Sequence, residues 1–138
     1  MADLLELPTR ARGKAEAVAL TLYDGAQAAH ELPGRARQLL QLAAAIYALG
    51  ERADPGRGDR AGRELALSAA LPGLSPERQQ IVAAAVALQR EKQRPNREST
   101  FVGLSGKHQQ VALRLAALLR VARAITAAPA DLLVHVHA

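Results

Sequence analysis

Apolar residues in this chain recur at the spacing of an α-helix, and nearly all of them are aliphatic. At about 100° per residue, one face of the segment 106–127 gathers Val111, Leu115, Leu118, Val121, Ala122 and Ile125. The aromatic residues are two Tyr and one Phe, so the core must be built from Leu, Val, Ile and Ala. Such side chains suit closely packed helices, and the sequence therefore predicts an all-α domain.

Capping and chain-breaking residues divide the sequence into about five helices. In chain order these are expected over about 9–28, 35–49, 59–70, 76–92 and 106–127. Thr9, Asp59 and Ser75 are the predicted N-caps, and Pro76 follows Ser75 at the first helical position. Gly50 is predicted to end the second helix.

One helical domain and a short C-terminal segment follow from this division. Residues 1–128 are predicted to form one helical domain, and residues 129–138 a C-terminal tail or strand. The tail is separated from the last helix by Pro129, and its LLVHVH alternates as a short strand does.

Several protein classes are excluded by what the chain lacks. Polar residues break every apolar run before ~18 residues, so no membrane span or membrane partner is expected. The absence of cysteine removes disulfides and zinc–thiolate sites. Acidic residues at Asp3 and Glu6, with no cleavage-site pattern, argue against a signal peptide. Together these features predict a cytoplasmic protein.

The charge of the chain favours anionic partners. Its net charge is +5, and arginine supplies fifteen of the eighteen basic residues. The planar guanidinium matches the oxygens of phosphate, which favours a phosphate-rich ligand. The alternative is that codon bias has scattered solvated arginines over the surface. Three arginines interrupt the last apolar helix: Arg120 and Arg123 fall opposite its apolar face, and Arg114 falls at the edge.

No active site can be recognised in the sequence. It has neither a phosphate-binding glycine loop nor a nucleophile elbow. His135 and His137 would share one face of the C-terminal strand, an arrangement that suits a metal, but no third ligand accompanies them. We therefore predict neither a metal nor a cofactor.

Four segments, in this order, resemble the helical C-terminal HD-like domain of the exopolyphosphatase and guanosine pentaphosphate phosphatase family. They are LYDGA (22–26), LLQLAAAIYALGE (39–51), LSAALPGLSPERQQIV (67–82) and LRLAALLRVARAI (113–125). The resemblance covers about residues 11–127, and its more specific pieces are LPGLS and LAALLRVA. It implies a compact HD-like fold.

The metal ligands of the HD superfamily are missing at the positions that match them. The His-Asp doublet falls on Tyr47 and Ala48, the loop histidines on Asp59 and Ala61, the next histidine on Gln89, the aspartate on Arg123, and the first histidine near Ala11. A fixed positive charge at Arg123 would oppose a bound cation. Arg123 then either occupies the place of the metal or lies on a solvated face.

The family's hydrolysis takes place in two actin-like N-terminal domains, which this chain lacks. The resemblance thus implies a non-catalytic module that binds polyphosphate or acts in dimerisation or regulation. The predicted anion-binding residues are Arg52, Arg57, Arg60, Arg63, Arg90, Lys92, Arg94, Arg97 and Arg123. With so few aromatic rings, no stacking platform for single-stranded nucleic acid is expected, and no helix-turn-helix pattern points to specific DNA binding.

Three alternatives remain open at this stage. The loop arginines could be merely solvated. The chain could be a fragment of a larger exopolyphosphatase-like enzyme. It could also be a phosphohydrolase with a relocated site that uses His108 or the His135 and His137 pair.

Overall fold

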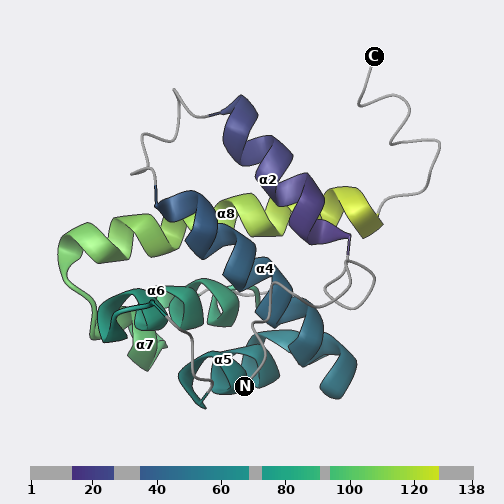
Figure 1. Ribbon diagram of the computed structural model, residues 1–138. Helices are drawn as coiled ribbons and strands as arrows, with labels where there is room; N and C mark the ends of the chain where they lie inside the picture. The colour runs from purple at the N-terminus through teal and green to yellow at the C-terminus, as the bar shows by residue number, and fades with distance from the viewer. Residues whose placement is uncertain (1–13, 27–34, 69–72, 91–93, 128–138) are drawn as a thin grey trace.

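The computed structural model describes residues 14–26, 35–68, 73–90 and 94–127, and the regular secondary structure in these ranges is all helical (Figure 1). The α-helices are α2 (Ala15–Gly25), α4 (Ala36–Ala53), α5 (Gly58–Ser68), α6 (Pro76–Ala87), α7 (Ser99–Val102) and α8 (Gly106–Ala127). A 3-10 turn, η2 (Pro95–Arg97), precedes α7. The prediction of an all-α fold is confirmed for this part of the chain. The predicted cap Thr9, Lys92 and the predicted strand lie outside the described residues.

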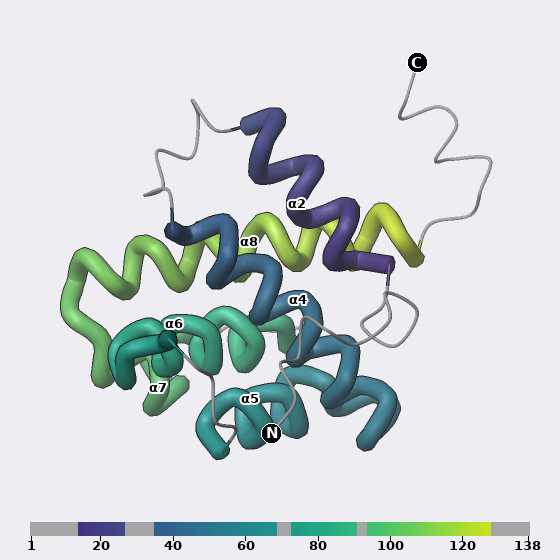
Figure 2. Tube along the Cα trace, in the orientation of Figure 1, coloured from purple at the N-terminus to yellow at the C-terminus, as the bar shows by residue number. Residues whose placement is uncertain are grey.

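Helix α6 is the centre of the core. Every residue from Ile81 to Leu88 is buried, and a helix that is apolar on all sides can only be stable when it is surrounded. Helices α4, α5, α7 and α8 all contact it, and α2 packs across α4 and α8 (Figures 1 and 2). Helices α4 and α8 touch each other, and each also packs against α6.

The buried face of α8 differs in part from the expected one. Its buried residues are Val111, Ala112, Leu115, Ala116, Leu119 and Ala122. Leu118 is only half-buried, and Val121 is 49% exposed. The alanines on this face let α2 and α6 approach closely. The helix therefore buries its small residues, and part of the more hydrophobic face predicted from the sequence stays exposed.

Gly50 does not end its helix, contrary to the prediction. Helix α4 continues to Ala53, and Gly50 lies where α4 crosses α5. A Cβ atom at this position would lie 2.5 Å from the backbone nitrogen of Gly62. A Cβ atom on Gly62 would in turn lie 2.6 Å from Cγ1 of Val86. The two glycines thus allow a close helix crossing, which explains their presence better than termination does.

The helix ends match the predicted caps and bounds in part. Ser75 accepts a hydrogen bond from the backbone nitrogen of Arg78 at 3.2 Å, which confirms it as the N-cap of α6. Helix α8 has the predicted bounds. Asp59 lies inside the first turn of α5 rather than at its cap, where its charge still favours the helix N-terminus. Helix α6 ends at Ala87, earlier than the predicted 92.

Candidate anion-binding cleft

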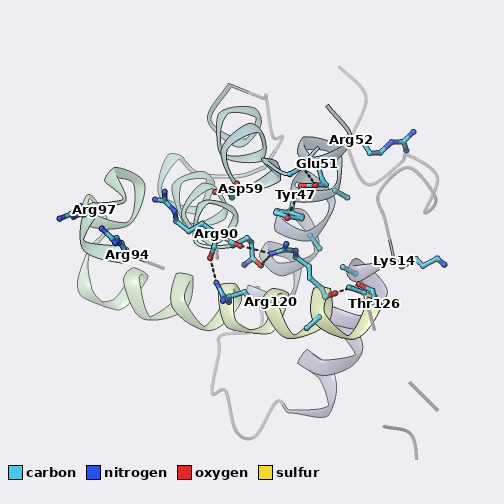
Figure 3. Close-up of a pocket in the computed structure, with 18 residues that line it drawn as sticks. Lys14, Tyr47, Glu51, Arg52, Asp59, Arg90, Arg94, Arg97, Arg120 and Thr126 are labelled. Atoms are coloured by element: carbon cyan, nitrogen blue, oxygen red, sulfur yellow. Dashed lines mark hydrogen bonds between the residues drawn. The ribbon is translucent and has the colours of Figure 1, made fainter. Parts of the chain in front are cut away.

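A cleft of about 1280 Å³ lies between α4 and α8, and one of its walls is formed by Gln89, Arg90, Arg94 and Arg97. Its basic lining residues are Lys14, Arg52, Arg90, Arg94, Arg97, Arg120 and Arg123. The acidic ones among the described residues are Glu51 and Asp59. In Figure 3, Arg94 and Arg97 lie at one end of the cleft, and Lys14 and Arg52 at the other. A concave surface dominated by one sign of charge concentrates counter-ions, here anions.

The cleft also gathers positions that the family resemblance equates with metal ligands. Tyr47 and Ala48 on α4, Asp59 on α5, Gln89 after α6 and Arg123 on α8 all line it. Ala61 is not among the lining residues, and Ala11 lies outside the described part of the chain. Within the described ranges, no three His, Cys, Asp or Glu side chains are grouped so that they could hold a metal ion.

Arg123 is held between Gln89 and Tyr47. Its Nη1 donates to the main-chain oxygen of Gln89 at 3.2 Å and to the side-chain Oε1 at 3.1 Å. The guanidinium carbon lies 4.1 Å from the centroid of the Tyr47 ring, a cation–π contact. Arg123 therefore lies in the cleft, and the alternative of a solvated face of α8 does not describe it.

Gln89 is the buried centre of this arrangement. Only 5% of the residue is exposed, and its Nε2 donates to the carbonyl oxygens of Ala85 at 3.1 Å and Ala116 at 3.0 Å. With Oε1 accepting from Arg123, its amide nitrogen and oxygen both have partners. A buried amide that is satisfied in this way fixes the relative position of α6 and α8.

Arg120 makes similar contacts one turn earlier on α8. Its Nη1 donates to the carbonyl oxygen of Arg90 at 2.7 Å and lies 3.5 Å from that of Leu88. The last carbonyls of a helix lack partners within the helix and carry partial negative charge. Arg120 and Arg123 together supply donors and positive charge there. This explains two of the three arginines in an apolar helix; the third, Arg114, is exposed.

Glu51 is engaged by the backbone at the start of α5. Its Oε1 accepts from the nitrogen of Gly56 at 2.6 Å, and its Oε2 accepts from the nitrogen of Gly58 at 2.9 Å. The hydroxyl of Tyr47 donates to the same Oε2 at a long 3.4 Å. Burial raises the pKa of Tyr47, and the neighbouring Arg123 opposes this rise.

The predicted anion-binding residues divide into two groups. Arg52, Arg90, Arg94 and Arg97, besides Arg123, line the cleft, whereas Arg57, Arg60 and Arg63 do not. The reason is clearest for Arg63, whose Nη1 binds Oε1 of Glu98 at 3.1 Å. Because the Glu98 side chain is only 5% exposed, this ion pair connects α5 to the segment that precedes α7.

Three charged lining residues were not predicted from the sequence. Arg120 carried a usable signal, because it lies three residues before Arg123 and therefore on the same side of the helix. Lys14, which precedes α2, and Glu51 carried none, since both reach the cleft only through packing between helices.

Comparison with models of known protein families and with curated proteins finds no match for this chain. None of the described helices has the length and apolar character needed to cross a membrane.

Proposed function

We propose that this chain is a non-catalytic HD-like domain, related to the C-terminal domains of exopolyphosphatases, that binds a phosphate-rich anion such as polyphosphate in the cleft. One observation carries the proposal: seven basic side chains surround a single cleft whose lining includes two acids. The carboxylate of Glu51 is already engaged by two backbone amides, which further favours an anionic ligand.

The shape of the cleft supports an extended ligand. Its basic residues come from both ends of the cleft as well as from its wall (Figure 3). An anionic polymer lying along the cleft could contact Arg94 and Arg97 at one end and Arg52 at the other. Charge-assisted hydrogen bonds from guanidinium groups to phosphate would hold it.

A divalent metal does not fit the lining that replaces the HD ligands. The positions matched by the resemblance carry Tyr47, Gln89 and Arg123, which already bond or stack with one another. The guanidinium would repel a cation at close range. These contacts support binding without metal-dependent hydrolysis. The alternative of a relocated site gains no support, because His108 does not line the cleft and His135 and His137 lie outside the described residues.

Two variants with equal loss of charge test the proposal. In the cleft variant, Arg52, Arg90, Arg94 and Arg97 are changed to Gln; in the control variant, Arg35, Arg57, Arg60 and Arg114 are changed to Gln. The affinity for long-chain polyphosphate is measured at several salt concentrations. The cleft variant loses charge-assisted hydrogen bonds to phosphate, and the loss of even one such bond corresponds to about a ten-fold change in affinity. The cleft variant should therefore bind polyphosphate at least about ten-fold more weakly than the original protein. The control should bind within about three-fold of the original protein.

Salt dependence provides a second measure, because polyanion binding releases counter-ions. The cleft variant should show a flatter dependence, by roughly one unit at most for each lost phosphate contact. Equal weakening in the two variants would show a generic basic surface in place of a site. Absence of binding at low salt would remove polyphosphate as the ligand.

A further inference from the structure

The two arginines that bind the end of α6 use only part of their donor capacity. Arg120 and Arg123 each bond the protein through Nη1. Their Nε and Nη2 atoms have no hydrogen-bond partner among the described residues. In a guanidinium group, Nε–H and one N–H of Nη2 lie side by side on the edge away from Nη1. Each arginine thus keeps one complete two-donor edge.

That edge is the one that matches two oxygens of the same anion. Arginine binds carboxylate and phosphate through such parallel N–H···O bonds. Both side chains line the cleft. Their positions are three residues apart on α8, so they are neighbours on its surface. Two such edges, on neighbouring side chains that both line the cleft, supply four donors and two positive charges.

Both guanidinium groups are also held in position before any ligand binds. Carbonyl oxygens at residues 88–90 fix one side of each, and the Tyr47 ring covers a face of Arg123. Side chains that are already ordered lose little entropy on binding, which favours affinity for a small ligand. By contrast, Arg90, Arg94 and Arg97 are exposed. These three side chains suit contacts along an extended anion more than the binding of one small anion in a fixed position.

Resting on the proposed function, we infer that Arg120 and Arg123 form a site for a single phosphoryl group within the cleft. A phosphoryl group carries about −1.5 to −2 charges at pH 7 and three acceptor oxygens, which matches two guanidinium edges better than a planar carboxylate with one charge. The group would come either from free phosphate or from the terminus of a polyphosphate chain. The interior units of a chain have fewer free oxygens and less charge, so the site favours chain ends.

Lysine substitutions test the site at constant charge. In Arg120→Lys/Arg123→Lys each ammonium can still donate to a carbonyl but lacks the planar two-donor edge. Binding of inorganic phosphate and of tripolyphosphate should weaken at least about ten-fold, the loss of one or more charge-assisted bonds. Long-chain polyphosphate at low salt should change less than about three-fold, because the number of charges is unchanged. The matched control Arg57→Lys/Arg60→Lys, at two arginines three residues apart that do not line the cleft, should leave phosphate binding unaltered.

A measurement on the unmodified protein covers the case in which the double variant unfolds. Titration with inorganic phosphate should shift the NMR signals of the Nε–H groups of Arg120 and Arg123 more than those of Arg94 and Arg97. If the first two signals do not move, or if the double variant is folded and binds phosphate normally, the inference is wrong. Preference for tripolyphosphate over phosphate would identify chain ends as the source of the group, and the reverse would identify free phosphate.

The two proposals fail in different ways. If long-chain polyphosphate binds in the cleft but phosphate leaves Arg120 and Arg123 unaffected, the phosphoryl site is refuted and the proposed function stands. If phosphate binds at these arginines but polyphosphate does not bind, the site stands and the polymer is not its ligand.

Discussion

Replacing Gly50 by alanine should destabilise the fold by forcing α4 and α5 apart. The added Cβ would lie 2.5 Å from the nitrogen of Gly62, 2.8 Å from its Cα and 3.0 Å from the carbonyl oxygen of Gly58. All three atoms belong to the backbone, so no side-chain rotation can relieve the contact. Ordinary contact begins at 3.4 Å, and the helices would therefore have to separate by about 1 Å.

Two opposing effects set the magnitude. Overpacking a close contact costs typically about 1–3 kcal/mol, occasionally more, and here it also disturbs Val86, which packs on Gly62. Alanine in place of glycine inside a helix contributes about 1 kcal/mol in the opposite direction. Since the contact involves two rigid helices, we expect the upper part of the range and a net loss of about 2 kcal/mol. For a chain of this size, that lowers the melting temperature by about 6–8 °C.

Urea and thermal unfolding followed by circular dichroism measure this loss. The matched control is Gly106→Ala in the first turn of α8, where no atom lies within 4 Å of the added Cβ. Its free energy of unfolding should stay within about 0.5 kcal/mol of the original or rise slightly. If Gly50→Ala were as stable as Gly106→Ala, the close crossing of α4 and α5 would not be required for the fold.

Two further predictions concern buried ionisable groups. Glu98→Ala leaves Arg63 without its buried partner and Thr100 without its acceptor. We therefore expect urea unfolding to show a loss of about 3 kcal/mol, near the lower end for a broken buried pair. The control Glu64→Ala removes an exposed carboxylate and should cost less than about 0.5 kcal/mol, so equal losses would contradict the buried ion pair between Arg63 and Glu98. Burial raises the pKa of both tyrosines, Tyr23 and Tyr47, above the usual value near 10. Because the folded pKa is the higher one, their contribution to stability is complete below pH 10 and is lost as the pH rises through the folded values. Tyrosinate absorbance should therefore appear at higher pH in the folded protein than in urea, and coincident titrations would refute this.

The helices themselves were largely predictable from the sequence, because their signals act over a few residues. The apolar spacing over 106–127 gave the bounds of α8, and Ser75 followed by Pro76 gave the start of α6. Gly50 shows where local reasoning fails. A glycine is a helix terminator by local rules, yet here its missing Cβ admits the backbone of Gly62, a contact that only the packing of α5 on α4 creates.

Tertiary structure decided which charged side chains line the cleft. Sequence proximity grouped Arg63 with Arg52, but Glu98, thirty-five residues from Arg63, draws this side chain into a buried ion pair. By helical spacing alone, Arg120 and Arg123 fall opposite the apolar face of their helix, although the family resemblance placed Arg123 at a metal-ligand position. Carbonyl oxygens that follow α6, those of Gln89 and Arg90, instead hold them in the cleft, because α8 packs beside α6. A sequence specifies which charges a protein has, but which of them share one site depends on the long-range packing that satisfies their hydrogen bonds.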